Sequence, residues 1–170
     1  MDRGEAEAEH LSETPVILVD AGPLVALVDE SDEHHARCVE ALKEVREPMG
    51  TVWPAVTEAL FLLVDVPEGQ DAVLEMLRRG AIRLVPLGHE DVGRVQELMA
   101  KYRDQPMDLA EAALVRVAER DGLDRVFTVD RRDFEVYRIG KRRIFQIIPE
   151  GSVGRRGRTR EAKRKRRSSA

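Results

Sequence analysis

The sequence predicts an α/β domain whose central, mostly parallel sheet has four or five strands, with helices on both faces. Short, continuous apolar runs such as residues 16–19 are rich in β-branched side chains, which is typical of buried strands. Segments with a helical spacing of apolar residues separate these runs, and such alternation favours parallel pairing. The length of 170 residues, with 42% hydrophobic and 35% charged residues, fits one globular domain with a real core.

The first half of the domain is expected to begin with a strand, two helices and a second strand. Residues 16–19 form the first strand, followed by helices at 21–28 and 32–45. The second strand is expected at 51–53. Pro54 then suits the first turn of a helix that continues to about Leu63.

The second half repeats this alternation. Gly80 is a typical residue for the position after a helix, which predicts that a helix at 70–79 ends there. Residues 130–133 are expected to form a turn. The remaining expected elements are strands at 82–85, 125–129 and 145–148, and helices at 89–102 and 107–120.

Charge divides the chain into three parts. Residues 1–14 carry five acidic residues and one basic residue, whereas residues 154–170 carry nine basic residues and one acidic residue. Neither end has apolar periodicity, so we expect a domain at 15–150 between an acidic extension (1–14) and a basic extension (151–170), both disordered when free. The basic extension is explained equally well as solvated chain and as a nucleic-acid contact.

Composition excludes several kinds of protein. The longest apolar stretch, residues 52–64, contains Glu58 and is too short to cross a membrane. The acidic N-terminal residues do not resemble a secretory signal peptide, so a cytoplasmic location is expected. With one cysteine, Cys38, an internal disulfide or a zinc site made of several thiolates is not possible.

Two acidic residues are expected at the ends of strands. Asp20 ends the first strand and Asp130 ends the fourth. The carboxyl ends of parallel strands lie along one edge of a sheet, where ligands bind at the point at which strand order reverses. Each residue could instead cap the helix or turn that follows it.

Glu58 and Asp108 are expected on helices. Glu58 is the one charged residue in 52–64, within a helix that is apolar nearly all round and places Trp53 and Phe61 in the core. A carboxylate there is costly unless a cation, such as an arginine, or a hydrogen-bond donor meets it. Asp108 stands at a helix start, where Glu111 three residues later completes a capping-box pattern, so capping explains Asp108 as well as a metal does.

Considered together, the four acids indicate a shared cation. Two unit charges 4 Å apart repel by about 4 kcal/mol at an effective dielectric near 20, so a cluster of carboxylates needs a counter-ion. Oxygen ligands without thiolates suit Mg²⁺ or Mn²⁺ rather than zinc.

Four segments in this order resemble the PIN-domain family of metal-dependent ribonucleases, and within it the VapC-type toxins of toxin–antitoxin pairs. The resemblance spans residues 16–148. It is carried by VILVDAGPLVALVD at 16–29, VTEAL at 56–60, DLAEAAL at 108–114 and FTVDRRDF at 127–134. Each segment contains one of the four acids, and any one segment alone is a weak signal.

The resemblance implies a PIN-like three-layer fold and a metal-dependent endoribonuclease. Asp20 and Asp108 would hold Mg²⁺ or Mn²⁺ directly, and Glu58 and Asp130 directly or through water. Thr128 and Asp133 would support these ligands. An RNA substrate, a homodimer and a cognate antitoxin are the partners that the resemblance implies, with no membrane.

The RNA phosphates need basic groups, because the domain itself is acidic. Arg131, Arg132, Arg142 and Arg143 are the candidates, although a solvated charged loop explains them equally well. Two other functions stay open. One is a phosphotransfer domain that uses Asp20 as phosphate acceptor, which leaves Glu58 unexplained, and the other is a non-catalytic PIN-like domain that binds RNA or protein.

Overall fold

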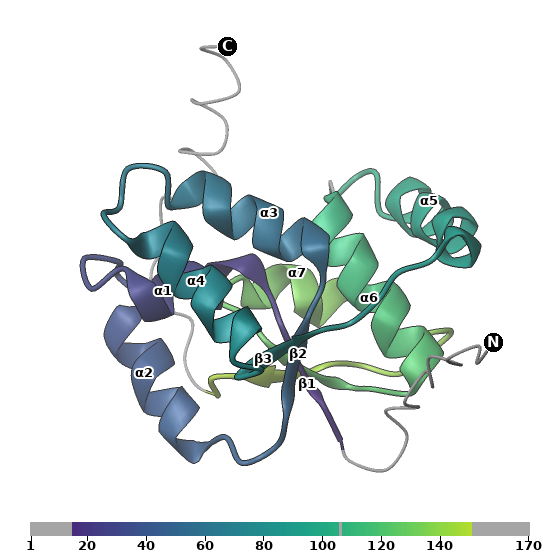
Figure 1. The fold of residues 1–170 in the computed structure, drawn as a ribbon. Coiled ribbons are helices and arrows are strands. Elements are labelled where there is room, and N and C mark those ends of the chain that lie inside the picture. Colours follow the sequence, from purple (N-terminus) through teal and green to yellow (C-terminus); the bar gives the residue numbers. More distant parts are fainter. Residues whose placement is uncertain (1–14, 106, 151–170) are drawn as a thin grey trace, which may run out of the picture.

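Five short strands form a single parallel sheet in the computed structural model, which describes residues 15–105 and 107–150 (Figure 1). The strand order is β3-β2-β1-β4-β5, and every pair of neighbours is parallel. The predicted α/β class, with four or five mostly parallel strands, is confirmed. The strands are β1 (Ile17–Val19), β2 (Met49–Thr51), β3 (Ile82–Leu84), β4 (Arg125–Phe127) and β5 (Gln146–Ile148).

The strand order reverses at β1. From β1 the chain builds outward through β2 to β3, and it then returns to place β4 on the other side of β1 and β5 beyond it. Val19 pairs with Phe127, so β1 and β4 end at the same level. Open parallel sheets typically bind ligands at the carboxyl edge next to such a reversal.

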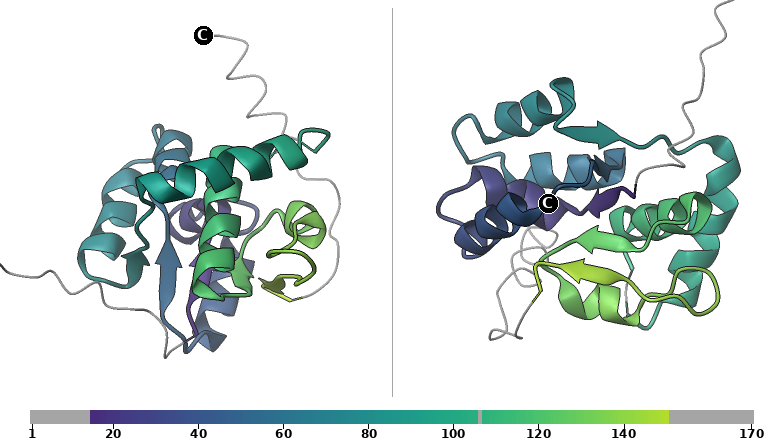
Figure 2. Two further views of the ribbon diagram at one scale, coloured as in Figure 1. Left: turned by 90° about the vertical axis from the view of Figure 1, so that its right-hand side faces the viewer. Right: turned by 90° about the horizontal axis from the view of Figure 1, so that it is seen from below.

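Helices cover both faces of the sheet, which gives three layers (Figures 1 and 2). Ile17 and Val19 belong to the core cluster under the first four helices, whereas Val16 and Leu18 belong to the cluster under the later ones. Successive strand residues point to opposite faces, so one apolar run fills two cores. The helices are α1 (Ala21–Val28), α2 (His35–Glu44), α3 (Trp53–Leu62), α4 (Gly69–Arg78), α5 (Val92–Lys101), α6 (Leu109–Asp121) and α7 (Arg131–Val136), with a short 3₁₀ helix at His89–Asp91.

Helix α3 is apolar on most sides, but it is not buried nearly all round as predicted. Trp53 and Phe61 were expected in the core, but they are 57% and 58% exposed, and Val64 just beyond the helix is 57% exposed. Ala55, Val56 and Ala59 are the residues of this helix that face the cores. The prediction was wrong because apolar spacing identifies hydrophobic faces without showing which of them another element covers.

Several element boundaries also differ from those predicted. Residues 130–133 do not form a simple turn, because Arg131–Val136 is the helix α7. Strand β2 ends at Thr51 rather than beginning there, and α2 begins at His35, after a series of turns, rather than at residue 32. These differences lie at the ends of elements or in a short segment, where local sequence signals are weakest.

The predicted extensions at 1–14 and 151–170 lie outside the described residues. Within 15–105 and 107–150, no helix has the length and apolar character needed to cross a bilayer.

Candidate active site

Asp20 is buried at the carboxyl end of β1, where it caps α1. Its Oδ1 accepts a hydrogen bond from the backbone N–H of Ala21 at 2.8 Å, and its Oδ2 accepts one from the Thr128 hydroxyl at 2.9 Å. The carboxylate is only 5% exposed. The predicted capping role is therefore confirmed, and it leaves Asp20 at the edge where the strand order reverses.

The surroundings of Asp20 disfavour its charge. Burial raises the pKa of this carboxyl from 3.8 to about 7, against the hydrogen bonds from Ala21 and Thr128 that lower it. The carboxylates of Asp130 and Glu58 raise the pKa further. The structure thus places two of the other predicted acids, Asp130 and Glu58, within electrostatic reach of Asp20.

Thr128 connects the two strand-end aspartates. Its hydroxyl donates to Asp20 and accepts from the backbone N–H of Asp130 at 3.0 Å. Gly22 permits this arrangement, because a Cβ at that position would lie 2.3 Å from Cγ2 of Val129. Only glycine lets α1 approach residues 128–130 this closely.

Asp108 and Glu111 form a reciprocal capping box at the start of α6. Oδ1 of Asp108 accepts from the N–H of Glu111, and Oε2 of Glu111 accepts from the N–H of Asp108, both at 2.9 Å. The predicted capping interpretation of Asp108 is confirmed. Capping and a role in binding are compatible, because a carboxylate has several acceptor positions.

Glu111, which the sequence predicts only as a capping partner, is also buried among the other acids. It is 7% exposed, and Oε2 also accepts a hydrogen bond from the Tyr137 hydroxyl at 3.0 Å. Burial raises the pKa of Glu111 from 4.5 to about 8, and the charges of Asp108, Asp20 and Asp133 add to this effect. The signal was present in the sequence, since Glu111 stands within the otherwise apolar segment 110–115.

These contacts define one acidic region, which we call the carboxylate edge. Asp20 experiences the charges of Asp130 and Glu58, and Glu111 experiences those of Asp20, Asp108 and Asp133. The donors are oxygen atoms. Burial, and after it the charges of neighbouring carboxylates, raise the pKa values of Asp20 and Glu111, and a cation would offset both effects, so these residues fit a hard divalent cation. The members of the carboxylate edge are Asp20, Glu58, Asp108, Glu111, Asp130 and Asp133.

The acids are not yet arranged as a finished ligand set. In the described part of the chain, no three His, Cys, Asp or Glu side chains form a group that could hold a metal ion.

The four predicted RNA-binding arginines do not gather at one place. Arg131 donates to the carbonyl of Pro149 at 2.8 Å and lies 3.7 Å from a carboxylate oxygen of Glu135. Arg132 is exposed on α7, which begins directly after Asp130. Arg142 and Arg143 precede β5, whose first residue pairs with the first residue of β4, so they lie at the amino edge of the sheet.

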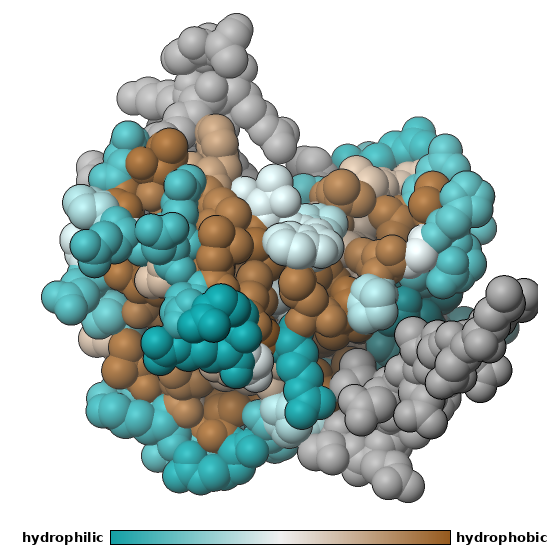
Figure 3. All heavy atoms as spheres, in the orientation of Figure 1, coloured by the Kyte–Doolittle hydropathy of each residue, from teal (hydrophilic) through white to brown (hydrophobic). Residues whose placement is uncertain are grey.

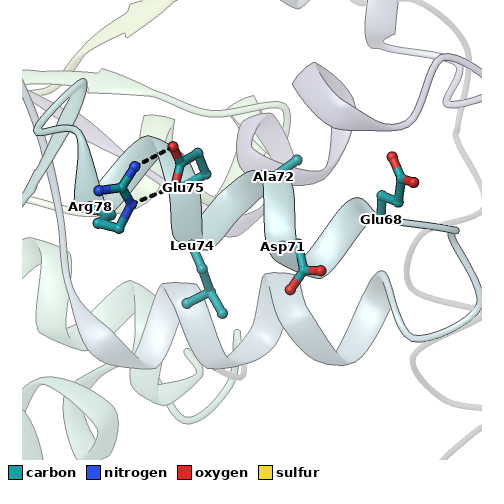
Figure 4. A pocket seen from close by; sticks show the side chains of 6 residues that line it. All are labelled: Glu68, Asp71, Ala72, Leu74, Glu75 and Arg78. Carbon is teal, nitrogen blue, oxygen red and sulfur yellow. Dashed lines mark hydrogen bonds and ion pairs between the residues drawn. The ribbon is translucent and has the colours of Figure 1, made fainter.

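The hollow on the outer side of α4 lies apart from the predicted site residues (Figure 4). Its volume is about 600 Å³, and Arg78 forms hydrogen bonds of 2.6 and 2.7 Å to Glu75 in its wall. None of its lining residues belongs to the carboxylate edge. They are Glu68, Asp71, Ala72, Leu74, Glu75 and Arg78.

Comparison with known proteins agrees with this fold. The PIN domain profile matches residues 17–140. Ribonuclease VapC26 of Mycobacterium tuberculosis is 33% identical over 137 residues, which cover 78% of this chain and all of that protein.

Two solved structures share the fold. VapC20 of Mycobacterium tuberculosis, described as a sarcin-ricin loop cleaving toxin, has a TM-score of 0.61 and 14% identity over 65% of this chain and 86% of that one. A toxin–antitoxin complex from Klebsiella pneumoniae contains a chain with a TM-score of 0.54 and 16% identity, over 71% of this chain and 91% of that one.

Proposed function

Because the chain belongs to the PIN domain family, we propose that it is a metal-dependent endoribonuclease and the toxin of a toxin–antitoxin pair. The carboxylate edge carries this proposal: buried Asp20 and Glu111 face further carboxylates at the carboxyl end of a parallel sheet. The name of the 33% identical relative supports ribonuclease activity. Since cellular RNA is the substrate, we place the activity in the cytoplasm.

Asp20 and Asp108 are the proposed direct ligands of Mg²⁺ or Mn²⁺. We add Glu111 as a third ligand, because the charges of both aspartates act on its carboxyl group and raise its pKa. Glu58 and Asp130 complete the set directly or through water. When bound, the cation supplies an activated water and neutralises charge on the phosphoryl oxygens.

The surrounding residues orient the carboxylates and the substrate. Thr128 fixes one oxygen of Asp20, and Tyr137 fixes one oxygen of Glu111. Asp20 and Glu111 hold protons near neutral pH until a cation takes their place, because the pKa values are about 7 and about 8. Asp133 supports these carboxylates. Arg132 is exposed, and we propose that its guanidinium group binds a substrate phosphate beside the carboxylate edge.

A homodimer and an antitoxin complete the proposal. Figure 3 shows hydrophobic residues gathered over α3 and toward α6, where Trp53, Phe61 and Leu109 are 57%, 58% and 52% exposed. Large exposed apolar patches mark interaction surfaces, and aromatic residues are enriched in them. We assign this surface (Trp53, Phe61, Val64 and Leu109) to a second copy of the chain. The toxin–antitoxin complex among the fold relatives supports an antitoxin partner.

Cleavage of mixed cellular RNA in Mg²⁺ or Mn²⁺ tests the function. The parent should cleave the RNA, and EDTA should abolish this cleavage. Asp20→Asn should cleave at least a hundredfold more slowly than the parent. Glu75→Gln is the matched control, because Glu75 is an acid on α4 paired with Arg78. Cutting by Asp20→Asn at the parent's rate would contradict the proposal. Absence of cutting by a folded parent that binds RNA would favour a non-catalytic PIN-like binding domain.

A further inference from the structure

The residue after β5, Pro149, lies level with Asp20 at the carboxyl edge of the sheet. The N–H of Asp20 donates to the carbonyl of Phe127, the last residue of β4, at 3.0 Å. The N–H of Thr128 likewise donates to the carbonyl of Ile148, the last residue of β5, at 3.0 Å. Neighbouring strands are about 4.8 Å apart, so the backbone at Pro149, two strands away, is about 10 Å from that at Asp20.

Two arginines from different helices meet at the carbonyl of Pro149. Nη1 of Arg131, the first residue of α7, donates to this oxygen at 2.8 Å. Nη2 of Arg37, in the first turn of α2, donates to the same oxygen at 3.3 Å. The two nitrogen atoms are therefore at most about 6 Å apart, and the like charges of the two guanidinium groups repel each other. We call Arg37 and Arg131 the arginine pair.

A neutral carbonyl does not balance the two positive charges of the arginine pair. Oε1 of Glu135 is 3.7 Å from Nη2 of Arg131, which is beyond hydrogen-bond distance, and the Glu135 side chain is 52% exposed. Such a solvated ion pair stabilises the arrangement little. A more highly charged anion between the two guanidinium groups would offset their repulsion.

The geometry of the arginine pair suits a phosphate group. The planar guanidinium group presents N–H donors in a fork that matches phosphate oxygens. Each group has five such donors, so a bond to the Pro149 carbonyl does not prevent either arginine from binding phosphate. Arg37 is exposed and Arg131 is partly exposed, so an anion from solution can reach them.

We propose that the arginine pair binds a phosphate of the RNA substrate, beside the phosphate that the carboxylate edge cleaves. This proposal rests on the proposed function in taking RNA as the substrate. The pair contributes affinity rather than sequence recognition, because contacts to phosphates carry no sequence information. The sequence did not reveal Arg37, since it lies outside the four segments that resemble PIN domains.

The test is binding of a labelled single-stranded 20-nucleotide RNA of mixed sequence to the full chain, in EDTA, from 50 to 200 mM salt. We expect Arg37→Gln to bind at least fivefold more weakly than the parent, and Arg37→Gln combined with Arg131→Gln at least tenfold more weakly. The salt slope of the double variant should fall by about 0.7, the value for one phosphate of a single strand.

The matched control is Lys43→Gln, which removes the same charge from the same helix. Lys43 pairs with Glu40 at 2.6 Å in the last turn of α2, which leads to the start of β2 and so lies toward the amino edge. This control should bind RNA within twofold of the parent. Arg37→Gln should also melt with the parent, since Arg37 is exposed, so its loss of affinity would not reflect unfolding.

Binding and cleavage separate this proposal from the proposed nuclease. An Arg37→Gln variant that binds RNA as tightly as the parent, with the same salt slope, overturns the phosphate site whether or not the parent cuts RNA, and would indicate an acidic protein segment as the anion instead. An equal loss in Lys43→Gln also overturns it, because net charge would then explain both results. A fall of about 1.4 in the salt slope of the double variant would mean two separate phosphates and contradict a shared one. A parent that binds RNA through the arginine pair without cutting supports the pair and contradicts the nuclease.

Discussion

Asp20 combines burial with like-charged neighbours, so its ionisation destabilises the fold when no cation is bound. Burial raises its pKa to about 7, and Asp130 and Glu58 add to the effect. The folded chain therefore retains a proton that the unfolded chain releases near pH 4, and stability falls as pH rises from about 4 to about 7. The slope from this one group is at most about 1.4 kcal/mol per pH unit.

Asp20→Asn removes this ionisation. Its single side-chain oxygen can still accept from the N–H of Ala21, while its amide NH2 takes the place of Oδ2 and can donate to the hydroxyl oxygen of Thr128. In EDTA, the melting temperature of the parent should fall relative to that of Asp20→Asn between pH 4 and pH 7. Thermal denaturation followed by circular dichroism measures both curves. Parallel curves across this range would contradict the account of Asp20.

Tyr137 is expected to act through Glu111. Tyr137→Phe removes the hydroxyl that donates to Oε2 of Glu111 and keeps the ring, which packs edge-on against Tyr102 at 5.0 Å and Phe134 at 5.5 Å. Loss of such a supporting hydrogen bond typically weakens metal binding 10- to 100-fold, so the Mg²⁺ concentration for half-maximal cleavage should rise about tenfold.

The matched control for Tyr137 is Tyr102→Phe. The Tyr102 hydroxyl accepts from the N–H of Arg138 instead of contacting a carboxylate. This variant should keep the parent's Mg²⁺ dependence. Equal shifts in the two variants would mean that Tyr137 serves only the packing of the aromatic cluster.

At the scale of elements, substitutions of Asp108 at the start of α6 can distinguish its role as a helix cap from its proposed role as a metal ligand. Asparagine is as good an N-cap as aspartate, whereas alanine costs about 1 kcal/mol. Asp108→Asn should therefore melt close to the parent, and Asp108→Ala should melt several degrees lower. Both should lose RNA cleavage, because neither supplies a carboxylate. Full cleavage by Asp108→Asn would remove Asp108 from the metal ligands.

The elements that sequence reasoning predicts well are those with strong local signals. Strand β1 ends at an aspartate, α6 begins at a capping box and α4 is followed by Gly80 with a positive φ of 72°, and each was expected. Helix α7 was missed because it has six residues, too few for an apolar period to be distinguished from a turn.

In the candidate site, too, the sequence predicts the residues that carry strong local signals and misses those that depend on tertiary contacts. The sequence could predict that Asp20, Glu58 and Asp130 lie near one another. Two of them follow strands that end at the same edge of a parallel sheet, and Glu58 is a lone charge in an apolar helix. Glu111 was missed although it is a lone acid in an apolar segment, since a capping box already explained it. Its second partner, Tyr137, lies 26 residues away, just beyond α7, and only the tertiary fold brings the two side chains together.

At the scale of the whole molecule, the exposed apolar surface of α3 predicts self-association. Phe61→Ser should convert a particle of two chains into one of a single chain of 19.2 kDa, as measured by sedimentation equilibrium. The control is Val136→Ser on α7, which is 37% exposed and lies outside this surface. A parent that sediments as a single chain would contradict the homodimer.

The charge distribution of the whole chain could be predicted from the sequence, but the edge to which each basic segment belongs could not. Lys141, Arg142 and Arg143 follow Asp130 closely in the sequence and yet lie at the amino edge of the sheet. The parallel return to β5 carries them there, and it then brings residue 150 back to the carboxylate edge. Sequence distance is therefore a poor guide to distance from the site.

Binding of Mn²⁺ to the full chain, measured by titration calorimetry at pH 8, tests most directly whether the carboxylate edge is a cation site. The account predicts that the parent and Glu75→Gln bind alike and that Asp20→Asn binds at least tenfold more weakly. It also predicts weaker binding by the parent at pH 6, where Asp20 and Glu111 hold protons. Absence of binding by the parent, or binding by Asp20→Asn as tight as the parent's, would contradict it.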